Sequence, residues 1–292
     1  MQRLFQYYAV AILCVSAIAY GLYLSAASGL VDFTGRELIG RDFVNYYSAS
    51  SLILDGAGET LMKVGEYRAY LQAQYEIALG LNWSYPPHYL FFVLPLGLFG
   101  YLPAYALWIG IGAVLFVAAT RLGLGAQRLD WVTYTLFTLA APAFLVNATF
   151  GQNGLITGAL LFLGVSLVRH RPILAGICLG ALTVKPQLGL LIPVFLLLRG
   201  HRTVIGSAIV TSAAMIALSA LIFDVELWRE YFDYVLPFQR IVAEEGTGIF
   251  LRMMPTGFAL GRLAGLDASL AMLVQAPFSL LALGLVIWTF RK

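Results

Sequence analysis

Long apolar runs separated by short polar stretches fill the chain from Phe5 to Phe290. A membrane-spanning helix needs about 20 predominantly apolar residues. The pattern therefore predicts an all-α polytopic membrane protein with about eight membrane helices. We expect them at residues 5–27, 103–120, 130–148, 154–168, 203–222 and 268–289, with two short helices inside 172–198.

The stretch 172–198 has 27 residues, too few for two full spans, and Lys185-Pro186 interrupts it near the middle. Basic residues flank both of its ends, so the chain is expected to go out and return. We predict a hairpin of two short legs whose tip carries Lys185, Pro186 and Gln187. Irregular backbone at membrane depth is stable only where protein or a water-filled cavity surrounds it. The tip is therefore expected to line a cavity.

Residues 28–101 form the first outer segment, and their pattern predicts local structure within it. Residues 43–54 are expected to form a helix that ends at Gly56. Within 65–79 the apolar and aromatic residues share one helical face, which is typical of an amphipathic helix in the membrane interface. The run 88–99 is too short to span and is expected to dip into the outer leaflet. Aromatic residues of the outer segments, including Trp83 and Trp228, are predicted as interfacial anchors.

Composition agrees with a membrane protein. Charged residues make up 11% of the chain and its mean hydropathy is +0.83, whereas soluble domains carry about 25% charged residues. We predict one transmembrane domain over 1–292, embedded in the lipid bilayer. No basic patch of the nucleic-acid-binding type occurs. Cys14 and Cys178 each lie in an apolar run, which argues against a disulfide framework or a thiolate metal site.

The basic residues predict the topology, because cytoplasmic loops are enriched in Lys and Arg. Placing every basic cluster inside gives a consistent path with a cytoplasmic N-terminus and a second outer segment at 223–265. The expected location is the inner (plasma) membrane. These clusters are Arg3, Arg121 to Arg128, Arg169 with Arg171, Arg199 with Arg202, and Arg291 with Lys292.

With this topology, four polar clusters fall on the outer face and suggest one polar site there. They are Arg41-Asp42, Tyr85-Pro86-Pro87-His88, Gly151-Gln152-Asn153-Gly154 and Lys185-Pro186-Gln187. An intramembrane lysine is costly and usually functional, and the Lys185 ammonium can neutralise a phosphate, including a lipid-linked one. The alternative is a lysine whose ammonium reaches the headgroups from a short helix.

Asp42 is a candidate general base for a hydroxyl nucleophile. Alternatively, Asp42 caps the following helix or pairs with Arg41, and the outer carboxylates Asp32, Glu37 and Asp55 compete for the role.

The amides of Gln152 and Asn153 suit sugar hydroxyls, and their flanking glycines permit close approach; a plain polar turn explains them equally well. His88 is a candidate ligand-binding residue or an ordinary interfacial histidine. No cluster of metal-ligating residues stands out.

At these residues the sequence resembles the GT-C-type membrane glycosyltransferases, and within them family 87, which includes polyprenol-phosphate-mannose-dependent mannosyltransferases. The resemblance runs from about Gly40 to about Arg202, and beyond 203 only the hydropathy is similar. Three segments carry it: GRDFVNYYSASSLILDG, YPPHYLFFVLPLGLFGYLP and GQNGLITGALLFLGVSLVRHRPILAGICLGALTVKPQLGLLIPV.

The resemblance implies transfer of a hexose from a polyprenyl-phosphate donor to a lipid or cell-envelope glycan on the extracytoplasmic face. It implies an inverting reaction without a metal or other cofactor. The family's base is an Asp of the first outer segment, a position that Asp42 occupies. Donor phosphate would contact Lys185 and Arg41. Sugar or acceptor would contact a further set of side chains, namely Gln152, Asn153, Gln187, Tyr46 and His88.

Family members usually continue with further helices, so we expect a short or C-terminally truncated member. A transporter or flippase of lipid-linked sugars remains the alternative function, because broken helices with polar tips also form transporter sites. An assembly partner without catalytic activity is a third possibility.

Overall fold

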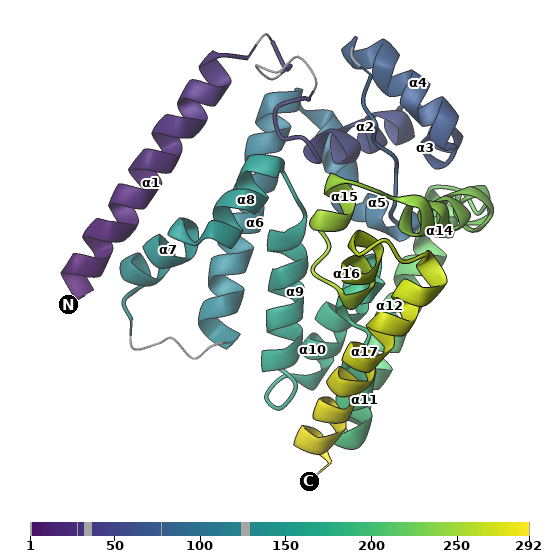
Figure 1. The fold of residues 1–292 in the computed structure, drawn as a ribbon. Helices are drawn as coiled ribbons and strands as arrows, with labels where there is room; N and C mark the ends of the chain where they lie inside the picture. Colours follow the sequence, from purple (N-terminus) through teal and green to yellow (C-terminus); the bar gives the residue numbers. More distant parts are fainter. Residues whose placement is uncertain (1, 28, 32–36, 77, 124–128, 292) are drawn as a thin grey trace.

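The computed structural model describes the chain except residues 1, 28, 32–36, 77, 124–128 and 292. The described residues form helices and one isolated antiparallel bridge between Val31 and Leu38, with no strand. Long helices run along one axis, and shorter helices form a cap across one end of them (Figure 1). Both termini lie at the end opposite the cap. The all-helical prediction is confirmed.

Four helices are long and apolar enough to cross a membrane, namely α1 (Gln2–Ser25), α6 (Tyr101–Gly123), α12 (Arg202–Ile222) and α17 (Ala268–Phe290). Large apolar side chains on them are exposed, among them Val114 at 70% and Leu221 at 81%. Continuous apolar surface of this kind is stable against lipid rather than water. The chain is therefore a multi-pass membrane protein.

The predicted number of about eight membrane helices is not confirmed. The helices α7 (Trp131–Ala140) and α8 (Pro142–Phe150) bend by 64° at their junction, so they add at most a fifth span. The remaining candidates, α9 (Gly154–Ser166), α10 (Pro172–Ala181) and α11 (Ile192–Leu198), have 13, 10 and 7 residues. Each is shorter than the 17 or so residues that a span requires.

The stretch 172–198 consists of α10 and α11 on either side of an irregular segment. That segment contains the 3-10 turns η3 (Leu182–Val184) and η4 (Pro186–Leu188), which meet at Lys185. The two ends of the stretch come together, because Arg169 and Arg199 line the same cleft. The stretch therefore leaves from one end of the molecule and returns to it (Figure 1).

Helix α10 packs tightly and in parallel against α12. A Cβ added at Gly176 would lie 2.6 Å from the Val204 carbonyl oxygen, and one at Gly180 would lie 2.6 Å from that of Ala208. Spacing of two glycines by four residues lets helix backbones approach closely in membranes. This contact holds α10, and with it the segment around Lys185, against a long helix.

The first outer segment forms most of the cap. Its helices are α2 (Phe43–Leu54), α3 (Gly58–Met62), α4 (Val64–Tyr75) and α5 (Leu90–Val93), with the 3-10 turns η1 (Pro87–Tyr89) and η2 (Leu94–Leu98). Helix α2 has the predicted bounds. On α4, Tyr67 and Leu71 of the predicted face are buried, and the Tyr67 hydroxyl donates to Asn45 Oδ1 at 2.9 Å. These contacts are with the protein itself, so an interfacial position for this helix stays a prediction.

The second outer segment contains α13 (Glu226–Glu230), the π-helical turn η5 (Tyr231–Val235), α14 (Leu236–Glu245), α15 (Ile249–Arg252) and α16 (Gly257–Leu263). Leu227, Tyr231 and Val235 belong to the same buried core as Phe43, Trp83 and Tyr89 of the first outer segment. Trp83 is only 1% exposed, so its prediction as an interfacial anchor is wrong. The two outer segments thus share one core.

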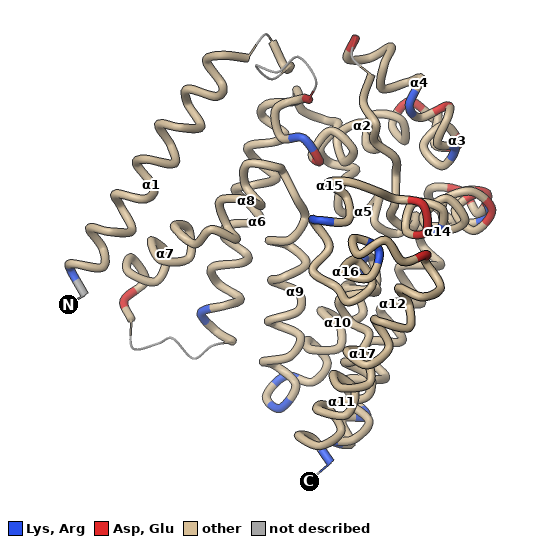
Figure 2. Tube along the Cα trace, viewed as in Figure 1, with Lys and Arg blue, Asp and Glu red and all other residues tan. Residues whose placement is uncertain are grey.

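At the end of the molecule away from the cap the charged residues are mainly basic, whereas the cap carries both acidic and basic residues (Figure 2). Several of the basic residues at this end lie at the ends of helices, namely Arg121, Arg171, Arg199, Arg202 and Arg291. Arg128 and Lys292 lie outside the described residues. This distribution of charge agrees with the predicted topology, while the side of the membrane that each end faces stays a prediction.

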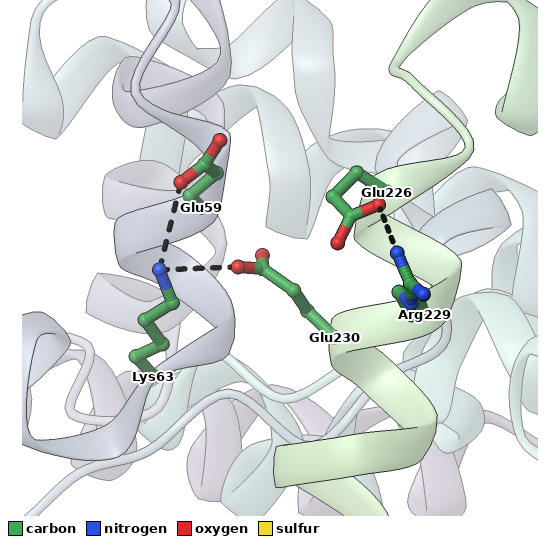
Figure 3. A network of polar contacts seen from close by, with 5 residues as sticks. All are labelled: Glu59, Lys63, Glu226, Arg229 and Glu230. Carbon is green, nitrogen blue, oxygen red and sulfur yellow. Dashed lines mark hydrogen bonds and ion pairs between the residues drawn. The ribbon is translucent and has the colours of Figure 1, made fainter.

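Lys63 joins the two outer segments through a buried carboxylate (Figure 3). Its Nζ lies 3.2 Å from Glu230 Oε1 and 3.5 Å from Glu59 Oε2. The side chain of Glu230 is only 7% exposed, and burial raises the pKa of its carboxyl group. Removing a partner from a buried charge is strongly destabilising.

Lys63→Met is therefore expected to lower the thermal unfolding midpoint by several degrees at neutral pH. The loss should shrink in acid, because protonation of Glu230 removes the uncompensated charge. Arg229→Met is the control, since the Arg229–Glu226 pair (3.4 Å) has side chains 73% and 45% exposed and such pairs contribute little. Equal midpoints for the two variants would contradict a structural role for Lys63.

Candidate functional site

Two tight turns bring the start of α2 against the end of α8. Gly40 and Gly151 have φ angles of +78° and +63°, in the left-handed region that glycine adopts most readily. A Cβ at Gly151 would lie 2.8 Å from the Gly40 carbonyl oxygen and 2.5 Å from Phe43 Cβ. The Asp42 N–H donates to the Phe150 carbonyl oxygen at 3.1 Å. These close contacts fix Asp42 beside residues 151–154.

Helix α6 supports the same turn from behind. Trp108 Nε1 donates to the Gly151 carbonyl oxygen at 3.2 Å, and the Tyr105 hydroxyl donates to the carbonyl oxygens of Ala148 and Thr149. The turn that carries Gln152 and Asn153 is therefore held by side chains of a long helix in addition to its own local hydrogen bond from the Gln152 N–H to the Asn147 carbonyl oxygen.

Gly151→Ala is expected to lower the thermal unfolding midpoint more than Gly200→Ala does. Both glycines follow a helix with similar φ angles, +63° and +68°, so both substitutions strain the backbone. Only at Gly151 would the new methyl group also clash, because nothing lies within 4 Å of a Cβ at Gly200. Equal losses would show that the turn is free to move away from Gly40.

The Asp42 carboxylate is held by an amide. Gln152 Nε2 donates to Asp42 Oδ2 at 2.7 Å, and the side chain of Asp42 makes no capping hydrogen bond to α2. Burial raises the pKa of the Asp42 carboxyl group above its ordinary value, although the Gln152 hydrogen bond and the charges of Arg41 and Lys185 act in the opposite direction. Because the Asp42 side chain does not cap α2, the alternative that it serves as a helix cap is excluded.

Lys185 is held by the neighbouring amide. Its Nζ donates to Asn153 Oδ1 at 2.9 Å, and Asn153 Nδ2 donates to the Tyr89 hydroxyl at 3.2 Å. Asn153 is 1% exposed, whereas Lys185 is half-buried. Lys185 therefore contacts protein polar groups, which a lysine extended toward the lipid headgroups would not do.

The two adjacent amides thus connect a carboxylate with an ammonium. Gln152 contacts Asp42 and Asn153 contacts Lys185, and the Cα atoms of consecutive residues are about 3.8 Å apart. The positive charge of Lys185 lowers the pKa of Asp42, so the two groups interact electrostatically. The structure brings together side chains from these three predicted polar clusters, and Tyr85 of the fourth cluster also interacts with Asp42 and Asn153.

The other basic candidate, Arg41, contacts a different carboxylate. Its Nε lies 3.2 Å from Glu37 Oε1, and its guanidinium lies 5.3 Å from the centre of the Phe150 ring. Among the competing carboxylates, Glu37 is therefore paired with Arg41, Asp55 is at the far end of α2, and Asp32 lies outside the described residues.

Tyr46 and His88 are buried behind the site. The Tyr46 hydroxyl is 3.1 Å from that of Tyr85. His88 is 3% exposed, so it is not an ordinary interfacial histidine. Its ring stacks on Trp228 with 5.5 Å between centres, and its Nε2 lies 3.3 Å from Thr183 Oγ1. Burial lowers the pKa of His88 to about 4. Gln187 is exposed, two residues beyond Lys185.

Sequence reasoning missed the aromatic wall of the site. The rings of Tyr85 and Tyr89 stack with 4.3 Å between centres, and the Tyr89 hydroxyl accepts from Asn153. The sequence pattern places Tyr85 in a polar cluster but Tyr89 in the apolar run 88–99. The two residues are four positions apart, but Pro86 between them is extended and the 3-10 turn begins only at Pro87, so no helical spacing predicts that their rings stack.

Within the described part of the chain, no three His, Cys, Asp or Glu side chains are grouped so that they could hold a metal ion. The polar groups that surround Asp42 and Lys185 are amides and tyrosine hydroxyls. Such groups can donate to and accept from the hydroxyls of a sugar. A reaction without a metal stays a prediction.

Comparison with known proteins gives one result. The family model described as glycosyltransferase family 87 matches residues 83–292. Searches of curated proteins and of solved structures found no match. The match extends to the end of the chain, so the expectation that only hydropathy is similar beyond 203 is wrong. It includes Gln152, Asn153 and Lys185 but begins after Asp42.

Proposed function

Because the chain belongs to glycosyltransferase family 87, and is therefore a membrane glycosyltransferase, we propose that it uses a polyprenyl-phosphate sugar as donor. The sugar is a hexose of the mannose type. The acceptor is a hydroxyl of a lipid or of a cell-envelope glycan, and transfer takes place on the extracytoplasmic face of the inner membrane.

One observation carries this proposal: consecutive amides hold a carboxylate and an ammonium at one turn. Glycosyl transfer from a phosphate requires a base for the acceptor and a positive charge for the leaving group. Asp42 and Lys185 supply these two groups. Asp42 lies before the residues matched by the family model, so its role rests on its contact with Gln152, which lies within them.

In the proposed reaction the acceptor hydroxyl oxygen attacks the anomeric carbon from the side opposite the phosphate. Asp42 takes the hydroxyl proton as the new C–O bond forms. The bond between the anomeric carbon and the phosphate oxygen breaks, and its electron pair leaves with the polyprenyl phosphate. The anomeric configuration is inverted. The Lys185 ammonium stabilises the charge that develops on the phosphate, where a fixed positive group is most effective.

The neighbouring residues have supporting roles in this proposal. Gln152 orients the Asp42 carboxylate and Asn153 orients Lys185 through the hydrogen bonds described above. Arg41, Gln187, Tyr46 and His88 remain candidates for contacts with the donor phosphate, the sugar or the acceptor. Arg41 is paired with Glu37, so a phosphate contact would require that pair to open.

The proposal is tested by incubating the purified protein with a panel of radiolabelled polyprenyl-phosphate sugars and a membrane lipid extract. We expect label to move from one donor into a new lipid or glycan product, with free polyprenyl phosphate released in equal amount. Movement of intact donor across sealed vesicles without a new product would instead support a flippase. Absence of both results with every donor would reject a polyprenyl-phosphate sugar as the substrate.

A further inference from the structure

Two adjacent clefts open at the basic end of the molecule, at the end of the 172–198 stretch opposite Lys185. The larger has a volume of about 350 Å³ and is lined by Arg169, Pro172, His201 and Arg202, among others. The smaller, of about 190 Å³, shares Arg169 and His201 with it. In the described part of the chain, the residues that line these clefts include no Asp or Glu. The clefts therefore have a positive lining.

The guanidinium groups of Arg169 and Arg202 have no protein partner among the described residues, since neither makes an ion pair or a side-chain hydrogen bond there. Both side chains are exposed at the mouth of the larger cleft. A guanidinium presents several donors in a planar fork that matches the oxygens of a phosphate. Two such groups at one cleft can bind one phosphate together.

Helix electrostatics supports an anion at the same place. The parallel helices α10 and α12 both begin at the larger cleft, with Pro172 and Arg202 as their first residues. Neither helix has a side-chain cap on its first turn. The start of a helix carries partial positive charge, so Arg202 lies at the unfavourable end of α12. An anion in the cleft would balance the partial positive charge of both helix starts and the positive charges of both arginines.

The smaller cleft distinguishes between kinds of anion. Beside Arg169 and Arg199 it is lined by the apolar side chains of Val165, Phe195 and Phe290. A cleft with cationic and apolar walls side by side suits a lipid. The lipid phosphate would contact the arginines, and its glycerol and acyl groups would contact the rings of Phe195 and Phe290. Basic pockets between membrane helices are known sites for phosphate headgroups.

We propose that the cleft lined by Arg169 and Arg202 binds the phosphodiester headgroup of an anionic membrane phospholipid. The bound headgroup joins the start of α10 to the start of α12 and to the end of α9. This site is separate from the transferase site and does not depend on the proposed reaction.

The test uses the purified full chain, with retention of phosphatidylglycerol and of phosphatidylcholine compared by native mass spectrometry and thermal unfolding. We expect preferential retention of phosphatidylglycerol and a raised unfolding midpoint with it. Arg169→Gln and Arg202→Gln should each reduce that preference about fivefold, the effect of one arginine near an anionic lipid. Arg171→Gln is the matched control, because Arg171 is exposed two residues from Arg169 but does not line either cleft.

Equal losses for Arg171→Gln and Arg169→Gln would overturn the site, because a general attraction of basic residues to anionic lipid would then explain the preference. Equal retention of both lipids by the wild-type chain, with no effect of inorganic phosphate, would also overturn it. Competition of inorganic phosphate with phosphatidylglycerol that depends on Arg169 would support the site, because it would show that the lipid is held there by its phosphate. The wild-type comparison and Arg169→Lys, which keeps the charge, remain informative if a glutamine variant fails to fold.

Discussion

Asp42→Asn is expected to lower the rate of sugar transfer by about 10²–10⁴-fold, the usual contribution of a general base, without loss of donor binding. Asparagine keeps the shape of the side chain and an oxygen that can accept from Gln152 Nε2, which donates to Asp42 Oδ2 at 2.7 Å in the wild-type chain. The turn should therefore stay in place while the ability to take a proton is lost. Single-turnover transfer and donor binding, measured on the same preparation, check this result.

Asp55→Asn is the matched control for this variant. Asp55 is exposed at the opposite end of the 12-residue helix α2, about 18 Å from its start at 1.5 Å per residue. The control should keep the wild-type rate. A rate for Asp42→Asn close to wild type, or an equal loss for Asp55→Asn, would remove Asp42 from the mechanism.

The pH dependence of the wild-type rate follows from the protonation state that a base requires. Asp42 acts only when ionised, so the rate should fall as the pH decreases through the pKa of this carboxyl group. Burial raises that pKa, so the midpoint of the fall should lie above the ordinary carboxyl value of about 3.9. Gln152→Leu removes a hydrogen bond that lowers the pKa, and it should move the midpoint further toward neutral pH.

The elements that sequence predicted well are those whose limits are set locally. Helix α2 has the expected bounds because an unbroken helix-compatible run ends at Gly56, which has a φ angle of +71°. The buried face of α4 follows the predicted spacing of Tyr67 and Leu71. In both cases the residues that decide the structure are neighbours in the chain.

The number of spans could not be predicted because hydropathy measures apolar content and does not measure helix length. The run 130–148 contains the break between α7 and α8 at Ala141-Pro142, since proline removes a backbone donor and disfavours a helical conformation in the residue before it. Helices α9 and α10 are apolar but end after 13 and 10 residues. Both pack against longer helices, α9 against α6 and α10 against α12, and this packing does not appear in a hydropathy pattern.

In the candidate site, too, the features set by local sequence were predictable and those set by tertiary contacts were not. Its residue types were predicted, because a lysine in an apolar hairpin and amides between glycines are unusual wherever they occur. The pairing of these residues was not predictable: Gln152 and Asp42 are 110 positions apart. Burial likewise depends on distant packing, as Trp83 shows by lying in one core with Leu227 and Tyr231 of the second outer segment. Tertiary contacts of this kind leave no periodic pattern in the sequence.

Lys185→Met is expected to lower the rate of transfer by about 10²–10³-fold, the usual cost of removing one fixed group that stabilises charge in a transition state. Methionine keeps an unbranched side chain but cannot neutralise the departing phosphate or donate to Asn153 Oδ1. The loss should appear in the rate of the chemical step. A donor whose released phosphate is a better leaving group should lose less, because it needs less stabilisation.

The pH dependence of this variant separates a charge effect from a packing effect. The Lys185 charge lowers the pKa of Asp42, so its removal should raise that pKa and move the acidic fall in rate to higher pH. Lys185→Arg keeps the charge, and its acidic limb should stay near that of the wild type even if its rate is reduced. A packing defect would slow both the Met and the Arg variant. It would leave the pH of the acidic fall in rate the same in both. An unchanged limb in Lys185→Met would mean that the ammonium and the carboxylate do not act on one reacting centre, since two charges that share a substrate must each alter the proton affinity of the other.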